Sequence, residues 1–395
     1  MSGLKKLLFL LLFLLSFFVR GEAQGDSCGL RFSLLTCAPG AELYSIFGHT
    51  ALRVTDAAAG TDAVYNYGTF EFGPDFYVQF VRGKLPYALS VEDFNSFLYN
   101  YDAESRSVWE QELLLNCDQK AQLNAALQTN ALPQNRTYRY DFLYDNCTTR
   151  AKDMIKRNAA QPIALTPILP KKIPTFRNLI HEKLDAGHLS WSKLGIDLLL
   201  GAKLDRKVPN EQAMFLPQNL LLGLEGATAN GQPLVKKAAV ILEKPSLLPK
   251  RNGFTPFIAF SLLLVAVIIL SMLRPKGFQR TIAVFDVLFF AVTGIVGIVL
   301  LVMWFGTDHA LCANNWNLAW ALPTHLVVSP FLRSNKGWVN NYLLATIIIQ
   351  SLLLIGWVFL PQELNTGFLP VVLLLLLRSW LIILKPHHGN PEPVV

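Results

Sequence analysis

The chain has 395 residues, of which 52% are hydrophobic and 16% are charged, and its formal net charge at pH 7 is +7. Residues 24–253 hold 25 Lys and Arg against 23 Asp and Glu, whereas residues 254–395 consist mostly of Leu, Val, Ile and Phe. Because a nucleic-acid-binding domain would carry a strong basic excess, this nearly neutral polar part excludes that class.

The first 23 residues have the pattern of a secretory signal peptide. Lys5 and Lys6 precede an apolar run over 7–19, and Gly21 and Ala23 are the small residues that a cleavage site requires. An uncleaved N-terminal anchor is the alternative. In both cases the segment that follows is exported.

An exported segment meets an oxidising compartment, where cysteines pair. The odd number of cysteines leaves at least one unpaired or pairs it between chains. Cys28 has two possible partners, Cys37 and Cys117, and the spacing does not choose between them. The five cysteines are Cys28, Cys37, Cys117, Cys147 and Cys312.

Residues 24–243 are expected to form an α+β domain, because short strands alternate with helical patterns. The remainder of this part is less regular: 196–201 fits a short helix, 214–224 fits the core better than a groove or a membrane contact, and Asn230-Gly231 fits a hairpin turn. Residues 244–253, with two prolines, are expected to tether this domain to the membrane part. The strands are expected at 31–35, 49–54, 63–67 and 136–144, and the helices at 91–100, 106–127 and 147–158.

Residues 254–395 are expected to form an all-α transmembrane bundle of five helices. A span needs about 20 apolar residues, and the third stretch is the weakest because it is short and contains Pro323 and Pro330. Lys and Arg occur in the loops 274–280 and 333–340 but not in the alternate loops, which places 24–253 outside and the C-terminus in the cytoplasm. The five stretches are 254–273, 281–304, 318–332, 341–360 and 367–384.

Polar residues within or near these spans are interpreted as helix-to-helix contacts, with snorkelling as a second interpretation for Arg378. They are Asp286, His325, Gln350 and Arg378. The loop 305–317 is rich in side-chain amides, and three interpretations stay open for it. It completes a site, holds a lipid headgroup, or forms a polar and aromatic belt at the membrane interface.

A cysteine and a histidine carry the chemistry of the exported part. Cys147 falls at the first turn of a helix, where free N–H groups and the helix dipole favour the thiolate. His49 begins a strand, and a nearby imidazole can take the proton of the thiol. The other histidines of this part, His181 and His188, lie in charged sequence and are expected to be solvated. The alternative for both Cys147 and His49 is an ordinary place in the core.

A third residue is needed to orient the imidazole. Asn66 on the next strand is the candidate, with Tyr67 as the alternative. The N–H groups of Cys147 and Thr148 are expected to hold an oxyanion, and Asp145 is expected to cap the helix. The sequence shows no metal-binding spacing and no phosphate-binding glycine loop, so no metal and no cofactor is expected.

The order of His49, a polar residue and Asn146-Cys147 resembles that of circularly permuted papain-like enzymes, which include NlpC-type peptidases and the lecithin:retinol acyltransferase superfamily. More closely, the chain resembles the Lnb family of lipoprotein N-acyltransferases, whose members have an exported papain-like domain and a five-helix membrane domain. The resemblance implies that Cys147 is the acyl-accepting nucleophile and His49 the base; Cys117 is not expected from the family pattern. The matching stretches are 35–40, 44–50, 66–70, 140–150, 195–201, 215–217 and 315–318.

The resemblance implies a multi-pass protein of the bacterial inner membrane that takes a fatty acyl group from a phospholipid onto Cys147. The α-amine of a diacylglyceryl-cysteine lipoprotein would then accept this group. A membrane-anchored cysteine peptidase or amidase acting on cell-wall peptides is the rival enzyme. A sensor or assembly factor without activity, in which Cys147 is bridged to Cys37 or Cys117, is the third interpretation.

Overall fold

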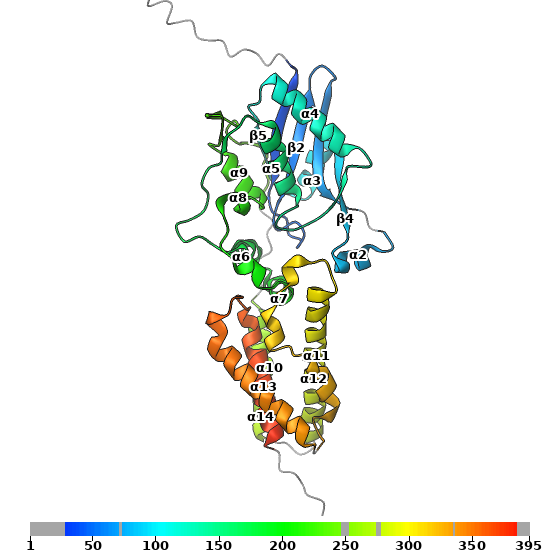
Figure 1. Ribbon diagram of the computed structural model, residues 1–395, viewed down its shortest axis with the longest axis vertical. Coiled ribbons are helices and arrows are strands. Elements are labelled where there is room, and N and C mark those ends of the chain that lie inside the picture. The colour runs from blue at the N-terminus through cyan, green and yellow to red at the C-terminus, as the bar shows by residue number, and fades with distance from the viewer. Residues whose placement is uncertain (1–27, 71–72, 246–252, 274–277, 335, 385–395) are drawn as a thin grey trace, which may run out of the picture.

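The computed structural model describes residues 28–70, 73–245, 253–273, 278–334 and 336–384. The expected signal peptide, most of the expected tether and the C-terminal residues 385–395 lie outside the described residues. An α+β region is stacked end to end on a helical region, and together they form an elongated molecule (Figure 1). The expected fold class, α+β followed by an all-α membrane region, is confirmed.

The α+β region is built on an antiparallel sheet with the strand order β10-β5-β1-β2-β3-β4-β6. Alternate side chains of each strand point to opposite faces. Phe32 and Leu34 join one hydrophobic cluster, while Leu35 and Cys37 join another, so both faces are covered. The strands are β1 (Leu30–Cys37), β2 (His49–Asp56), β3 (Thr61–Thr69), β4 (Pro86–Asp93), β5 (Val108–Glu112), β6 (Thr137–Arg139) and β10 (Ala239–Leu242).

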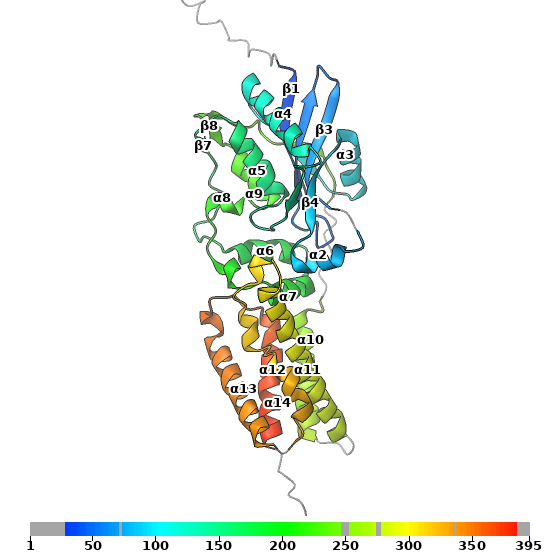
Figure 2. The same cartoon turned by 45° about the vertical axis from the view of Figure 1, so that its right-hand side comes forward.

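Helices α4 (Cys117–Ala131) and α5 (Cys147–Asn158) pack on the first face, and α3 (Phe94–Ala103) packs on the second (Figure 2). The helix predicted over 147–158 is confirmed. The helices predicted over 91–100 and 106–127 begin too early, because their first residues pair in the sheet as parts of β4 and β5. Asp93 and Asn116 are the N-caps at which α3 and α4 begin. The strand expected over 136–144 is reduced to β6.

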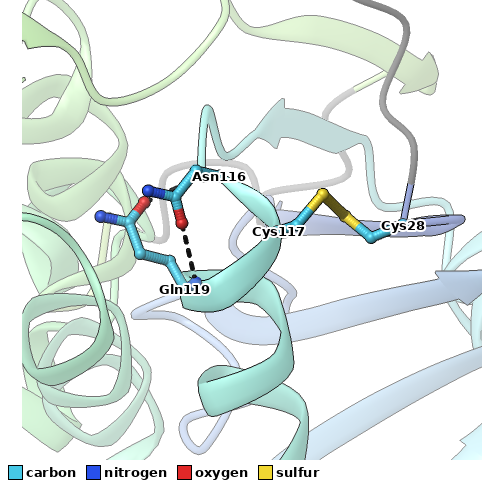
Figure 3. Close-up of a disulfide and its surroundings, with 4 residues drawn as sticks. All are labelled: Cys28, Asn116, Cys117 and Gln119. Atoms are coloured by element: carbon cyan, nitrogen blue, oxygen red, sulfur yellow. Dashed lines mark hydrogen bonds between the residues drawn. A yellow bond between two sulfur atoms is a disulfide. The ribbon is translucent and has the colours of Figure 1, made fainter.

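A disulfide joins Cys28 to Cys117 (Figure 3). It ties Cys28, two residues before the start of β1, to the first residue of α4. Helix α4 begins with a capping box formed by Asn116 and Gln119. Cys37, Cys147 and Cys312 are free. The pairing that the sequence left open is therefore Cys28 with Cys117, and Cys147 keeps its thiol.

The chain between α5 and β10 forms small helices and a hairpin below and beside the sheet. The expected turn is confirmed, because Asn230 and Gly231 adopt φ of 49° and 77° between β8 and β9. The helix expected over 196–201 is instead α7, which begins at Ser190. These elements are β7 (Ile163–Ala164), α6 (Phe176–Ala186), α7 (Ser190–Leu199), η1 (Ala202–Asp205), α8 (Asn210–Ala213), α9 (Pro217–Leu224), β8 (Thr228–Ala229) and β9 (Gln232–Pro233).

Within the described residues, four helices are long and apolar enough to cross a membrane. They are formed by α10 (Pro256–Leu273), α11 (Phe278–Phe305), α13 (Gly337–Gly356) extended by η5 (Trp357–Phe359), and η6 (Thr366–Phe368) followed by α14 (Leu369–Ile383).

The third predicted span is not one continuous helix. Between Trp316 and Phe331 the chain forms three short helices: η3 (Trp316–Ala319), α12 (Thr324–Val328) and η4 (Ser329–Phe331). Pro323 lies just before α12 and Pro330 within η4, and proline does not continue a helix. Gly294 and Gly297 of α11 leave no space for a Cβ against the backbone of Leu326 and Ala321. Glycine therefore allows this broken segment to pack closely on α11.

Arg378 does not snorkel toward the bilayer surface. Its guanidinium forms a bidentate ion pair with Asp286, with Nε–Oδ1 and Nη2–Oδ2 distances of 2.6 and 2.9 Å. Its third nitrogen donates to Ser271 Oγ at 2.7 Å. The pair is buried and joins α10, α11 and α14, so the helix-contact interpretation is confirmed for these two residues.

A buried polar network connects α6 and α7 to the loops of the membrane helices. Asp197 of α7, with no exposed surface, accepts hydrogen bonds from Arg177 Nη1 at 2.7 Å and from His181 Nε2 at 2.8 Å. Asn365, from the loop before α14, donates to the same carboxylate at 2.8 Å. The expectation that His181 is solvated is therefore wrong, because helix α6 buries it against Asp197.

The loop 305–317 contributes to the same junction. Asn315 donates to the carbonyl oxygens of Leu198 and Leu199, and Asn317 donates to that of Asp197. These amides satisfy carbonyl groups at the C-terminal end of α7, which a helix cannot satisfy internally. Their main observed role is to attach the exported region to the membrane helices.

Candidate active site

The three side chains singled out from the sequence lie together at the end of the sheet that faces the membrane helices. His49 is the first residue of β2, Asn66 lies on the neighbouring strand β3, and Cys147 is the first residue of α5. His49 Nε2 donates to Asn66 Oδ1 at 2.6 Å. The other ring nitrogen remains for the Cys147 thiol, whose pKa His49 lowers.

Asn66 is itself held by a residue that the sequence did not single out. Its Nδ2 donates to Glu92 Oε1 on β4 at 3.0 Å. Because the carboxylate only accepts, this bond turns the amide so that its oxygen faces the imidazole. Tyr67, the alternative orienting residue, instead donates to Asn130 at 2.6 Å.

The position of Cys147 is fixed by Asn146, which caps α5. The Asn146 Oδ1 accepts from the N–H groups of Thr148 and Thr149 at 2.9 Å each. Its Nδ2 donates to the carbonyl oxygens of Phe142 and Phe215. The expectation that Asp145 caps the helix is wrong: Asp145 forms an ion pair with Arg150, with Nε–Oδ1 at 2.6 Å.

The same cap changes the expected oxyanion site. The Thr148 N–H is occupied by Asn146, so it cannot stabilise an oxyanion without breaking the helix cap. The Cys147 N–H is left as the backbone candidate. The Thr148 hydroxyl instead contacts the thiol and lowers its pKa. It lies 3.7 Å from Cys147 Sγ and 3.1 Å from Thr50 Oγ1.

A tyrosine hydroxyl completes the surroundings of the thiol. A Cβ placed on Gly68, whose φ is +91°, would lie 3.7 Å from Cys147 Cβ and 3.9 Å from Tyr138 Oη. Tyr138 Oη is buried and has no hydrogen-bond partner within the part of the chain that the structure describes. The Arg150 guanidinium lies 3.5 Å from the centre of the Tyr138 ring and holds it in place. Sequence reasoning missed Tyr138, because nothing in the pattern distinguishes it from the other tyrosines.

The surroundings favour an ionised thiol paired with an imidazolium. Burial opposes ionisation of Cys147, but His49, the Thr50 N–H and the Thr148 hydroxyl outweigh it and lower the pKa of the thiol to about 7. Burial likewise opposes protonation of His49, but Cys147 and Asn66 outweigh it and raise the pKa of the imidazole. Cys37, opposite His49 on β1, is a contrast: burial raises the pKa of its thiol to about 12.

We expect alkylation of Cys147 by iodoacetamide to rise with pH through about 7 and then level off, because only the thiolate reacts. In the His49→Ala protein the imidazole no longer lowers the pKa of Cys147, whereas burial still raises it. The midpoint should therefore move above the ordinary value of 9.0. Mass spectrometry of the Cys147 peptide over a pH series measures both midpoints. A midpoint that is the same in the two proteins would show that the imidazole does not act on this thiol.

Two family models match the chain. Residues 20–182 match the model described as the Lnb N-terminal periplasmic domain, and residues 249–388 match the one described as the Lnb transmembrane domain. The first match contains His49, Asn66 and Cys147, and the second contains α10, α11, α13 and α14. No curated protein and no solved structure matches the chain.

Proposed function

The chain belongs to the Lnb family, with its periplasmic and transmembrane domains, and from this premise we propose that it is a lipoprotein N-acyltransferase with Cys147 as nucleophile. The acyl donor is a membrane phospholipid, and the acceptor is the α-amine of a diacylglyceryl-cysteine lipoprotein. The protein resides in the bacterial inner membrane, with residues 24–243 as the periplasmic catalytic domain and the C-terminus in the cytoplasm.

The observation that carries the proposal is a free, activated thiol at the end of the sheet that faces the membrane helices. Cys147 has a lowered pKa, a histidine partner and an amide that orients this histidine. Both proposed substrates are anchored in a bilayer, so their reacting groups lie near its surface. An activated thiol at this end of the exported region fits both of them.

In the first half-reaction the Cys147 thiolate attacks the carbonyl carbon of a phospholipid acyl ester. The new C–S bond forms, the ester C–O bond breaks, and the leaving alkoxide takes the proton held on His49. The products are an acyl-thioester on Cys147 and a lysophospholipid. Asn66 keeps the imidazole directed at the thiol in both protonation states, since its oxygen accepts from Nε2 throughout.

In the second half-reaction the α-amine of the diacylglyceryl-cysteine attacks the thioester carbonyl. The C–N bond forms, the C–S bond breaks, and neutral His49 takes the proton of the amine. The thiolate and imidazolium pair is then restored. One thiol thus serves a two-step, ping-pong transfer that needs no further reactant.

Each step passes through a tetrahedral oxyanion that needs hydrogen-bond donors. We assign this role to the Cys147 N–H and the Tyr138 hydroxyl. The buried Tyr138 hydroxyl has no hydrogen-bond partner among the described residues, and it lies near Gly68, which also neighbours the Cys147 side chain. Burial raises the pKa of Tyr138, so its hydroxyl keeps its proton and remains a donor.

The acyl-enzyme provides the direct test. We expect the purified full-length protein, incubated with phospholipid of one defined acyl chain and no acceptor, to gain the mass of one acyl group on the Cys147 peptide. Hydroxylamine should remove it, because it cleaves thioesters. A synthetic diacylglyceryl-cysteine peptide should discharge it and gain the same mass. A protein that stays unmodified but cleaves cell-wall peptides would be the rival peptidase, and the transferase assignment would fail.

A further inference from the structure

A continuous series of aromatic rings leads from the candidate active site toward the membrane helices. We call it the aromatic strip: Tyr140, Tyr87, Phe70, Phe76 and Phe80. Tyr87 stacks on Tyr140 with 4.3 Å between ring centres, and Phe70 lies 5.3 Å from Tyr87 and 5.6 Å from Phe76. Phe76 and Phe80 are 6.2 Å apart on helix α2 (Phe76–Arg82). Each ring thus contacts the next.

The inner end of the strip lies on the side of the sheet that carries the thiol. Tyr140, Tyr87 and Cys147 all pack against the same hydrophobic cluster. Phe70 follows two residues after Gly68, which packs against the Cys147 side chain. An extended chain lying along the strip would therefore lead toward the surroundings of Cys147.

The outer end of the strip is helix α2, which buries none of its residues. Tyr77 is 75% exposed, and Val78, Phe80 and Val81 are each slightly more than half exposed. Apolar side chains on nearly every side of a short helix leave a surface that water solvates poorly.

Helix α2 is tied to the loop that leaves the membrane helix α11. His309 Nε2 donates to the carbonyl oxygen of Phe80 at 2.9 Å, and the Asp308 N–H donates to that of Arg82 at 3.0 Å. Since α11 ends at Phe305, helix α2 lies within a few residues of the end of a span. Both views show it at the lower edge of the α+β region, above the upper end of the membrane helices (Figures 1 and 2).

We propose that the aromatic strip binds the fatty acyl chain of the donor phospholipid, and that the exposed side of α2 lies in the bilayer surface and admits the chain. This rests on the proposed transferase function and names its donor-binding surface. A peptide substrate would need main-chain hydrogen-bond partners, which rings do not supply, whereas an acyl chain needs only apolar contact. Lys84 and Arg139, both more than half exposed, form ion pairs with Asp308 at 3.9 and 2.7 Å. Two positive charges against one negative charge leave one net positive charge near α2, which suits a phosphate headgroup.

The test separates a membrane donor from a soluble one. The full-length protein is placed in phosphatidylethanolamine–phosphatidylglycerol nanodiscs, and acylation of Cys147 is followed by mass spectrometry. In parallel, the same protein reacts with p-nitrophenyl butyrate, a short-chain ester that does not need the strip. We expect Val78→Ser/Val81→Ser to slow acylation from the phospholipid about tenfold and to leave the reaction with the butyrate ester unchanged.

The matched control is Val91→Ser/Val240→Ser, which changes two valines of similar exposure on β4 and β10. It should react like the wild type with both donors. Phospholipid acylation at the wild-type rate in the α2 variant, or an equal loss with both donors, would overturn the proposed entry of the acyl chain over α2 onto the strip and leave the transferase function standing. A wild-type protein that takes no acyl group from phospholipid would instead overturn the transferase function.

Discussion

Replacement of Cys147 by serine is expected to leave lipoprotein N-termini without the amide-linked acyl chain, a loss of at least about 10⁴-fold in transfer rate. Serine fills nearly the same volume, so α5 and its Asn146 cap should stay in place. Its hydroxyl does not ionise near pH 7, whereas the surroundings of Cys147 hold the pKa of the thiol at about 7. Mass spectrometry of N-terminal lipopeptides, from cells in which this is the sole N-acyltransferase, measures the result.

Cys37→Ser is the matched control for this variant. Cys37 pairs with His49 across β1 and β2, and it is a buried free thiol close to the same imidazole. Burial raises the pKa of Cys37 to about 12, so it carries no charge at neutral pH and has no role in the proposed reaction. Lipoproteins should be N-acylated normally in this variant. Full N-acylation in the Cys147→Ser cells would exclude Cys147 as the nucleophile.

The positions of His49, Asn66 and Cys147 could be expected from the sequence because each depends on local structure. A histidine that begins a strand, an amide on the next strand and a cysteine that begins a helix need only short-range patterns and one sheet register. The details around them depend on contacts between distant segments. Asn146 caps α5 in place of Asp145 because its own amide is held by Phe142 and by Phe215, which lies 69 residues away.

The helices predicted over 91–100 and 106–127 begin too early for a related reason. Val91 belongs to β4 because it pairs with Tyr65 of β3, and the spacing of apolar residues in its own segment cannot show that partner. Helix α2 was not expected for a different reason. It buries none of its residues, so it lacks the one-sided apolar pattern by which a packed helix is recognised.

The junction between the two parts was the least predictable region. His181 stands in a charged segment, yet it lies against Asp197 at 2.8 Å, and Asn365 reaches the same carboxylate from the membrane part. A buried carboxylate needs several donors to offset its loss of hydration. Here the donors come from segments up to 168 residues away, so only the folded chain shows why these residues are present.

Replacement of Arg378 by methionine is expected to destabilise the membrane helices by about 3–5 kcal/mol. The variant leaves the Asp286 carboxylate buried among apolar helices without its bidentate partner, and it removes the donor that holds Ser271 of α10. Methionine keeps most of the side-chain volume, so the loss of charge pairing dominates. Thermal unfolding of the detergent-solubilised protein in a Cys37→Ser/Cys147→Ser background, followed by exposure of buried Cys312 to a thiol dye, measures the change.

The double variant Arg378→Met/Asp286→Leu separates the ion pair from packing, because it removes both charges together. Replacing both members of a buried ion pair by apolar residues often leaves the stability unchanged or raises it. Removing only one member lowers the stability, because it leaves an unpaired buried charge. We therefore expect the double variant to recover most of the lost stability, with a coupling energy between the two positions well above that of distant sites. If the single and double variants unfolded at the same temperature, the side chains would act through volume alone, and the ion pair would not be what holds α10, α11 and α14 together.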